Sequence, residues 1–207
     1  MAKNETTVFI VDDDQAMRNS LRWLLESVGR KVETYESANH FLSDYYPGRS
    51  GCLVLDVRMP GMSGLELQEK LVSDQITMPV IIITGHGDVP MSVRAMKAGA
   101  VDFVEKPFND QVLLDCIQRA LDQDEKQRGQ QSKRADVASK LAQLTPREHE
   151  VMKMVVSGKP NKVVADQLNV SAKTVEAHRA KVMEKMQASS LAELVKMALI
   201  ADVFDDE

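Results

Sequence analysis

Polar side chains follow four apolar runs in the first half of this 207-residue sequence. They are Asp12 and Asp13 after residues 7–11, Asp56 after residues 52–55, Thr84 after residues 80–83, and Lys106 shortly after residues 101–104. Such apolar runs are typical of strands buried on both faces. The carboxyl ends of parallel strands meet at one edge of an open α/β sheet, and ligands bind there. We therefore expect the five side chains to lie together.

The chemistry of this set indicates a site that accepts a phosphoryl group. Three carboxylates repel one another unless a cation neutralises them, and an all-oxygen site of this kind suits Mg²⁺, or Mn²⁺ in its place. Lys106 adds a positive charge and Thr84 a hydroxyl, so Asp56 could act as the nucleophile. Two bland interpretations stay open. Asp56 could cap the turn after it, and residues 12–14 could cap the next helix, a role that we expect of Asp14.

Apolar residues at helical spacing follow each of five apolar runs. The expected strands span residues 7–11, 32–35, 52–55, 80–83 and 101–104, and the expected helices span residues 17–28, 38–45, 65–72, 91–98 and 111–121. Five strand–helix units with short connections predict an α/β domain in which helices cover both faces of a parallel sheet.

The charge changes sign along the chain. Residues 1–124 carry 12 Lys and Arg against 19 Asp and Glu, whereas residues 125–201 carry 14 against 8. A basic second domain favours contact with nucleic acid, although it could also dock on an acidic first domain. The sequence has no long apolar stretch and no signal-peptide pattern, so we expect a soluble, cytoplasmic protein without a membrane partner. Cys52 and Cys116 are expected to be reduced core residues.

We expect three segments: a first domain at residues 1–121, a linker at 122–143 and a second domain at 144–207. The linker is polar and rich in Gln and Lys, a composition that forms a solvated helix or a loose tether. We expect it to extend the helix at 111–121 and to break near Gly129.

The second domain is predicted to be a small all-α domain of four helices. Capping boxes at residues 145–148 and 190–193 mark the first and the last of them. Between these, helices at residues 161–168 and 172–186 are separated by a tight turn, which predicts a helix-turn-helix.

The helix at 172–186 has an apolar face opposite a face of small and charged residues. Val175, Val182 and Met186 should point inward. The opposite face carries Lys173, Glu176, Ala177 and Ala180, with Thr174, His178, Lys181 and Lys185 along one flank. Such a face suits the major groove of DNA, where lysines reach phosphates, alanines permit close approach and a glutamate can accept from cytosine. An ordinary solvated face is the alternative.

Residues 7–121 resemble the receiver domain of bacterial two-component response regulators, with VDDD, LDVRMPGMSG, TGHG and KPF at the expected places. The resemblance implies a flavodoxin-like sheet with strand order 2-1-3-4-5. It also implies that a sensor histidine kinase phosphorylates Asp56. Asp12, Asp13, Asp56 and the backbone carbonyl of Arg58 would then hold Mg²⁺.

Further roles follow from the same resemblance. Lys106 would contact the phosphoryl group, Thr84 would move toward it, and Gly85 would leave room for it. Phe103 matches the aromatic switch position whose ring follows Thr84, although an ordinary core aromatic would look the same in the sequence. His86 would tune the lifetime of the phosphoryl group.

Residues 144–200 resemble the DNA-binding domain of LuxR-type regulators. The whole chain is similar to the FixJ branch of the NarL/FixJ response regulators, most specifically at TVEAHRAKVMEKM. The resemblance implies base contacts from Glu176, Ala177 and Ala180, and backbone contacts from Lys173, Thr174, His178 and Lys181. Arg179 is expected to pack through its aliphatic stem while its head reaches outward. The last helix would form a dimer contact on DNA.

These observations predict a DNA-binding transcriptional response regulator that dimerises and binds a promoter when phosphorylated. The expected partners are a sensor histidine kinase, double-stranded promoter DNA, a second copy of the chain and RNA polymerase. No enzymatic activity is expected beyond Mg-dependent phosphotransfer to, and dephosphorylation of, its own Asp56. The alternative is a phosphorylation-controlled switch whose second domain acts mainly through protein contacts. A phosphatase acting on external esters is disfavoured, because no second acid stands two residues after Asp56.

Overall fold

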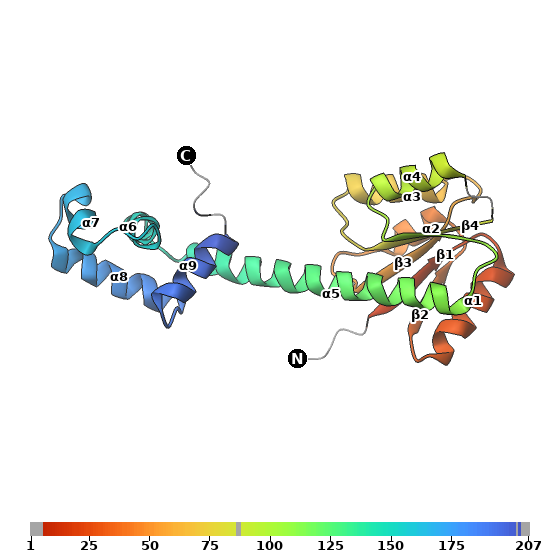
Figure 1. Cartoon of the computed structure of the whole chain (residues 1–207), viewed down its shortest axis with the longest axis horizontal. Coiled ribbons are helices and arrows are strands. Elements are labelled where there is room, and N and C mark those ends of the chain that lie inside the picture. The colour runs from red at the N-terminus through yellow and green to blue at the C-terminus, as the bar shows by residue number, and fades with distance from the viewer. Residues whose placement is uncertain (1–5, 86–87, 202, 204–207) are drawn as a thin grey trace. The chain divides into compact units, whose positions relative to one another are not determined.

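The computed structural model describes residues 6–85, 88–201 and 203, and its helices and strands are labelled in Figure 1. The chain divides into two compact units, the first extending to Gln127 and the second beginning at Arg128. Each unit buries apolar clusters of its own.

The described residues of the first unit form a five-stranded parallel sheet. The strands are β1 (Thr7–Val11), β2 (Lys31–Tyr35), β3 (Gly51–Asp56), β4 (Val80–Thr84) and β5 (Asp102–Glu105). Their order, β2-β1-β3-β4-β5, confirms the predicted flavodoxin-like topology. The register pairs Val11 with Leu55 and Asp56 with Ile83, so the carboxyl ends of β1, β3 and β4 lie side by side.

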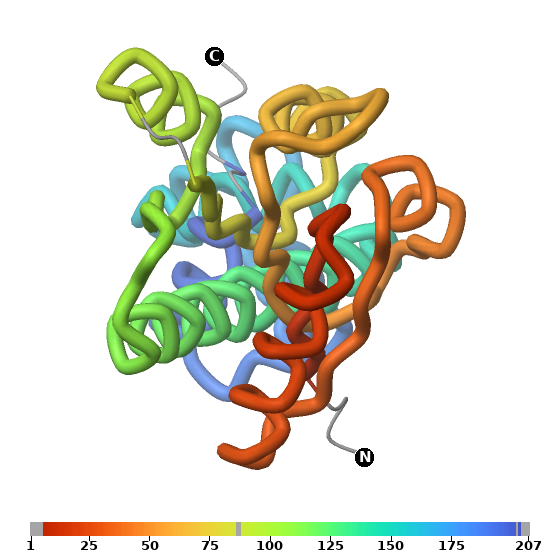
Figure 2. The backbone as a smooth tube through the Cα atoms, turned by 90° about the vertical axis from the view of Figure 1, so that its right-hand side faces the viewer, coloured from red at the N-terminus to blue at the C-terminus, as the bar shows by residue number. Residues whose placement is uncertain are grey.

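Helices cover both faces of this sheet, as predicted. They are α1 (Gln15–Ser27), α2 (Ala38–Asp44), α3 (Gly64–Ser73), α4 (Val89–Lys97) and α5 (Asp110–Leu141). Alternate residues of each central strand face opposite sides. Ile10 therefore packs with residues of α1 and α5, while its neighbour Phe9 packs with α2 and α3. Figure 2 shows α3 and α4 on the opposite side of the strands from α1 and α5.

Helix α5 differs from the prediction. It continues without interruption from Asp110 to Leu141, so the expected break near Gly129 was wrong. A glycine interrupts a helix when its backbone leaves the helical region or when a left-handed cap forms there. Gly129 does neither, because the glycines with positive φ in the described residues do not include it. The glutamines, lysines and arginines around it are good helix formers, which explains why the helix carries through.

The described part of the second unit contains four further helices and the end of α5. The helices are α6 (Pro146–Val156), α7 (Asn161–Leu168), α8 (Ala172–Met186) and α9 (Leu191–Ile200). Val137 of α5 is buried in their common core together with Val151, Val175 and Leu194. The helix-turn-helix is confirmed: α7 ends at Leu168, its C-cap residue Asn169 has a left-handed φ of 53°, and Ser171 caps α8 by accepting from the Thr174 amide.

The two predicted capping boxes have different outcomes. At α6 both bonds of the box are present, between the Thr145 hydroxyl and the Glu148 amide and between the Glu148 carboxylate and the Thr145 amide. At α9 the Ser190 hydroxyl accepts from the Glu193 amide. The Glu193 carboxylate, however, accepts from the amide and hydroxyl of Ser189, one residue earlier. The second box is therefore only half formed at the residues predicted.

Among the described residues, no helix combines the length and apolar character needed to cross a bilayer.

Candidate functional site

The carboxyl ends of the strands bring two acids and a lysine into contact. Asp12 follows β1, Asp56 ends β3, and Lys106 follows β5. The Lys106 Nζ lies 2.8 Å from Asp12 Oδ2 and 2.6 Å from Asp56 Oδ1. Asp12 is only 1% exposed and Asp56 only 6% exposed. A single ammonium therefore bridges two nearly buried carboxylates that are 44 residues apart in the sequence.

Burial and neighbouring charges have opposite effects on the pKa values of Asp12 and Lys106. Burial raises the pKa of Asp12, because desolvation penalises the carboxylate more than its bond to Lys106 stabilises it. Burial opposes the charge of Lys106 as well. Its bonds to Asp12 and Asp56 nevertheless outweigh that effect and raise the Lys106 pKa. Two carboxylates share one ammonium at this site, so a further cation would be favourable there.

The loop after β3 fixes the Asp56 side chain. The Arg58 amide donates to Asp56 Oδ2 at 2.7 Å, which leaves Oδ1 facing Lys106. The start of α3 then folds back, with the Gly64 amide donating to the Val57 carbonyl at 3.0 Å. A Cβ on Gly64 would lie 2.1 Å from the Asp56 carbonyl oxygen, so only glycine permits this approach. The LDVRMPGMSG motif therefore positions the acid through its backbone.

Thr84 and Gly85 complete this edge on the side of β4. Thr84 is fully buried, and its carbonyl accepts from the Lys106 amide at 2.8 Å. The peptide bond after Lys106, to Pro107, is cis. A Cβ built on Gly85 would meet no atom within 4 Å, so open space lies beside Thr84. The proposed role of His86 falls outside the described residues.

Arg18 of α1 binds the backbone of the acidic loop after β1. Its Nη1 donates to the carbonyl oxygens of Asp12 at 2.7 Å and of Asp13 at 2.9 Å. Sequence reasoning missed this arginine, because a single basic residue in the first turns of a helix carries no distinctive pattern. Asp14 caps α1 by accepting from the Ala16 amide, as expected.

The oxygen donors at this site are of the type that binds a hard divalent cation. Their positions in this structure, however, do not yet form a metal site. Asp12 and Asp56 supply carboxylate oxygens, the ligands that a hard divalent cation prefers. Within the described ranges, however, no three acidic, histidine or cysteine side chains are grouped closely enough to hold a metal. The Asp13 side chain is exposed, and Lys106 lies between the other two acids.

Phe103 lies on β5 and is half-buried against the core on the side of α2 to α4. Its amide donates to Asp102 Oδ1 at 2.8 Å. This position fits both interpretations of the residue, as a switch and as an ordinary core aromatic.

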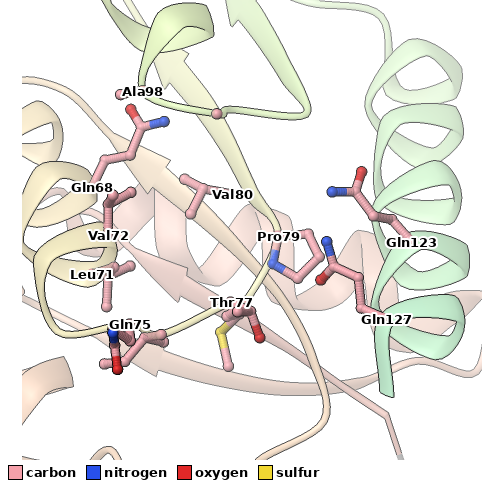
Figure 3. A pocket seen from close by; sticks show the side chains of 13 residues that line it. Gln68, Leu71, Val72, Gln75, Thr77, Pro79, Val80, Ala98, Gln123 and Gln127 are labelled. Carbon is pink, nitrogen blue, oxygen red and sulfur yellow. The ribbon is translucent and has the colours of Figure 1, made fainter. Parts of the chain in front are cut away.

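A cleft of about 270 Å³ lies at the other end of β4, away from Asp56. Figure 3 shows Gln68 and Val72 of α3 on one side of it and Gln123 and Gln127 of α5 on the other, with Pro79 between them. None of the described residues that line it is charged. The phosphoryl chemistry predicted for the first unit therefore has no counterpart in this cleft.

Helix α8 presents the predicted face to solvent. Lys173, Glu176, Ala177, Ala180 and Lys181 are exposed, while Thr174 and His178 are half-exposed. Val175, Val182 and Met186 are buried, which confirms the predicted inward face.

Two basic side chains of α8 are engaged within the unit. Lys185 donates to Glu148 Oε2 at 2.6 Å. That bond, with the Thr145 amide, lowers the Glu148 pKa to about 2. Arg179 Nη1 donates to Asn161 Oδ1 at 2.5 Å. The expectation that the Arg179 head reaches outward was therefore wrong, because its guanidinium donates to an acceptor on α7.

Comparisons with known proteins agree with this two-part organisation. Residues 8–118 match a family model described as the response regulator receiver domain, and residues 142–198 match one described as bacterial regulatory proteins, luxR family. The transcriptional regulatory protein FixJ of Bradyrhizobium diazoefficiens is 46% identical over 200 residues, covering 96% of this chain and 97% of that protein. FixJ of Rhizobium meliloti is 49% identical over 193 residues, covering 93% and 95%.

Solved structures show the same likeness. A low-resolution structure of the response regulator StyR is 45% identical, with a TM-score of 0.86 over 94% of this chain and 98% of that one. Full-length FixJ from B. japonicum is 44% identical, with a TM-score of 0.59 over 97% of this chain and 98% of that one.

Proposed function

This chain belongs to the FixJ-like two-component response regulators, which join a receiver to a LuxR-type DNA-binding domain. We therefore propose that it is a transcription factor switched by phosphorylation of Asp56. A receiver implies a sensor kinase as partner, and a LuxR-type domain implies DNA. The observation that supports the switch most directly is the contact of Lys106 with Asp12 and Asp56, in a chain that also carries the exposed face of α8.

In the proposed reaction, an Asp56 carboxylate oxygen attacks the phosphoryl group carried by a histidine of the sensor kinase. The new O–P bond forms as the P–N bond to that histidine breaks. Lys106 and the Thr84 hydroxyl bind phosphoryl oxygens, and the open space beside Gly85 accommodates the group. Arg58 contributes its amide, which already orients Asp56. No external substrate is turned over.

Receiver domains generally depend on Mg²⁺. In this chain Asp12, Asp13, Asp56 and the Arg58 carbonyl would hold it, or Mn²⁺, and the bound cation would neutralise the charge of the entering phosphoryl group.

The phosphoryl group then competes with the carboxylates for Lys106. Thr84 is drawn inward, Phe103 follows, and the surface formed by α4, β5 and the start of α5 changes. We propose that this surface joins two receivers and that the two DNA-binding domains together hold two half-sites, which strengthens weak single contacts.

The receiver is assigned to residues 1–121, the linker to 122–143 and the DNA-binding domain to 144–207. The cytoplasm is its place of action, and RNA polymerase its further partner.

On DNA, α8 is proposed to enter the major groove. Glu176, Ala177 and Ala180 face bases, whereas Lys173, Thr174, His178 and Lys181 approach phosphates. The exposure of this face supports the assignment, because a groove-binding helix must leave it free.

Sedimentation velocity with and without beryllofluoride, a phosphoryl mimic, and Mg²⁺ tests the switch on the full chain. The wild type should change from monomer to dimer on addition of both, whereas Asp56→Asn should keep the monomer mass. An unchanged wild-type mass would contradict phosphorylation-dependent dimerisation, and an equal response of Asp56→Asn would place the switch elsewhere.

The alternative is a second domain that acts mainly by binding protein. Leu191 and Leu199 of α9 are 43% and 60% exposed and would suit such a contact. Salt separates the two functions, because each phosphate contact contributes about 0.9 to the slope of log K against log salt. A steep slope on promoter DNA supports DNA binding, and a flat one supports the protein-binding alternative.

A further inference from the structure

Arg179 lies in α8 among the basic side chains of the proposed DNA-reading face, but it is placed differently from Lys173 and Lys181. Those two lysines are exposed, whereas Arg179 is half-buried. It lines a small cavity between α6, α8 and α9, together with Val151 and Leu194. Its head is turned to α7, where Nη1 donates to Asn161 Oδ1 at 2.5 Å.

Asn161 is placed to serve this contact. It is the first residue of α7, and the residue before it, Pro160, makes no side-chain bond to the helix start. The side-chain oxygen of Asn161 is engaged by Arg179 of the next helix. The bond spans 18 residues of sequence and joins the start of α7 to the middle of α8 across the turn between them.

We propose that Arg179 and Asn161 form a clamp that fixes α8 against α7, and that Arg179 is a positioning residue for DNA reading, with no contact of its own to phosphate. A hydrogen bond from a charged donor is stronger and more directional than a neutral one. Base contacts depend on how the recognition helix is seated in the groove, whereas attraction to phosphates depends mainly on charge. Breaking the bond between Arg179 and Asn161 should therefore weaken sequence-specific affinity for DNA more than non-specific affinity. The inference rests on the proposed DNA-binding function.

The test compares two DNA probes on the full chain with beryllofluoride and Mg²⁺. One is a fluorescein-labelled duplex selected from a random-sequence pool by the wild-type protein, and the other is a scrambled duplex of equal length and composition. Fluorescence anisotropy gives Kd for both over a range of salt concentrations. Thermal unfolding of each variant establishes that it is folded at the assay temperature.

Asn161→Ala is the most informative variant, because it breaks the clamp without changing charge. It should weaken binding to the selected duplex about tenfold, leave the scrambled duplex within about twofold, and keep the salt slope of the wild type. Arg179→Ala should do the same, and the double variant should be no weaker than Arg179→Ala alone. Asn161→Asp keeps the acceptor oxygen but adds a negative charge, so it should weaken both duplexes while keeping the wild-type ratio of their Kd values.

Lys181→Ala provides the matched control, since it removes a charge from the exposed face. Its salt slope should fall by about one and both duplexes should weaken together. The same behaviour in Arg179→Ala would overturn the proposal and make Arg179 a phosphate contact. Full specific binding by Asn161→Ala would overturn it too, as would additive losses in the double variant. If Arg179→Ala does not fold, the two Asn161 variants still decide the question.

Failure of the proposed function gives a different result. If the wild type selects no sequence and binds neither duplex, DNA binding itself is wrong. If the wild type binds the selected duplex and the Asn161 and Arg179 variants match it, only the clamp is wrong.

Discussion

Lys106 takes part in two sets of interactions at the carboxyl ends of the strands. It bridges Asp12 and Asp56, and its own amide donates to the Thr84 carbonyl. The contact to Asp56 uses Oδ1, the carboxylate oxygen that the Arg58 amide leaves free. The residue that would bind the incoming group is therefore already in contact with the acid that would receive it.

Asp12→Asn should stabilise the first unit at neutral pH in EDTA, by an amount on the order of 1 kcal/mol. Folding raises the Asp12 pKa, so the folded state binds that proton more tightly than the unfolded state. The free energy of unfolding of the wild type consequently falls as pH rises through the ordinary aspartate pKa toward the raised one. The advantage of the variant should be present above this window and vanish below it. Urea unfolding followed by circular dichroism measures both.

Mg²⁺ gives the matching control. Added Mg²⁺ should stabilise the wild type more than Asp12→Asn, since a ligand stabilises the state that binds it. A variant that is less stable than the wild type in EDTA at neutral pH would show that the bond to Lys106 outweighs the cost of burying Asp12.

Glu148→Gln should loosen the start of α6 at neutral pH. The carboxylate accepts from Lys185 and from the Thr145 amide, and its pKa is lowered to about 2. A group with a lowered pKa stabilises the fold above its ordinary pKa and loses that effect as pH falls toward the lowered value. Amides of α6 should exchange about tenfold faster in the variant at pH 7, a loss typical of a broken helix cap. The difference should disappear between about pH 4.5 and pH 2.

Glu150→Gln is the control, because Glu150 pairs with Arg147 on the same helix but stays exposed. A pH-independent difference between wild type and Glu148→Gln would contradict the role assigned to the charge.

At the scale of elements, α5 is the helix that differs most from its prediction. Its pattern of apolar residues supports a helix at 111–121, and the polar residues that follow have no such pattern to locate an end. Exposed helix formers and i,i+4 pairs such as Asp136 with Lys140 carry the helix on to Leu141. Gly129 lies within it.

Gly129→Ala should stabilise α5 by about 0.5–1 kcal/mol, the usual difference between glycine and alanine inside a helix. A Cβ there meets no atom within 4 Å, so the methyl adds no clash. Hydrogen exchange of residues 125–133 in the full chain should slow about two- to fivefold. Faster exchange would mean that the helix is interrupted at this residue.

Gly99→Ala is the matched comparison. Its Cβ would also meet no atom within 4 Å, but its φ is +86°, so alanine should destabilise the first unit there.

At the scale of the whole molecule, the core of the second unit begins inside α5. Val137 is only 4% exposed and packs with the apolar residues of α6 to α9. The family match to the luxR-type domain begins at residue 142, after this valine. A DNA-binding fragment cut at that point would lose part of its core.

Val137→Ala should destabilise the second unit by about 2 kcal/mol, as expected when two buried methyl groups are deleted. Fragment 128–207 should accordingly be more stable to urea than fragment 142–207, with circular dichroism as the measurement. Lys133→Ala, at an exposed position of the same helix, should change stability little. Equal stability of the two fragments would show that Val137 is dispensable.

The sequence by itself determined the two-part organisation, the sheet order implied by the receiver motifs, and the inward face of α8. The organisation and the inward face follow from local patterns: apolar runs, capping residues, and a helical period that separates Val175, Val182 and Met186 from the charged face. The sheet order followed from the resemblance to receiver domains. Most element bounds were predicted to within two residues for the same reason.

Only the tertiary structure decided which partners the polar groups find. Arg18 against the acidic loop, Arg179 against Asn161, and Lys185 against Glu148 each join residues from different turns or helices. A long, flexible basic side chain can reach acceptors in several directions, and its sequence neighbours do not indicate which one packing brings within reach. The same holds for Lys106: the sequence placed it at the strand ends, but its contact with both Asp12 and Asp56 depends on its side chain reaching past β4, which lies between β3 and β5.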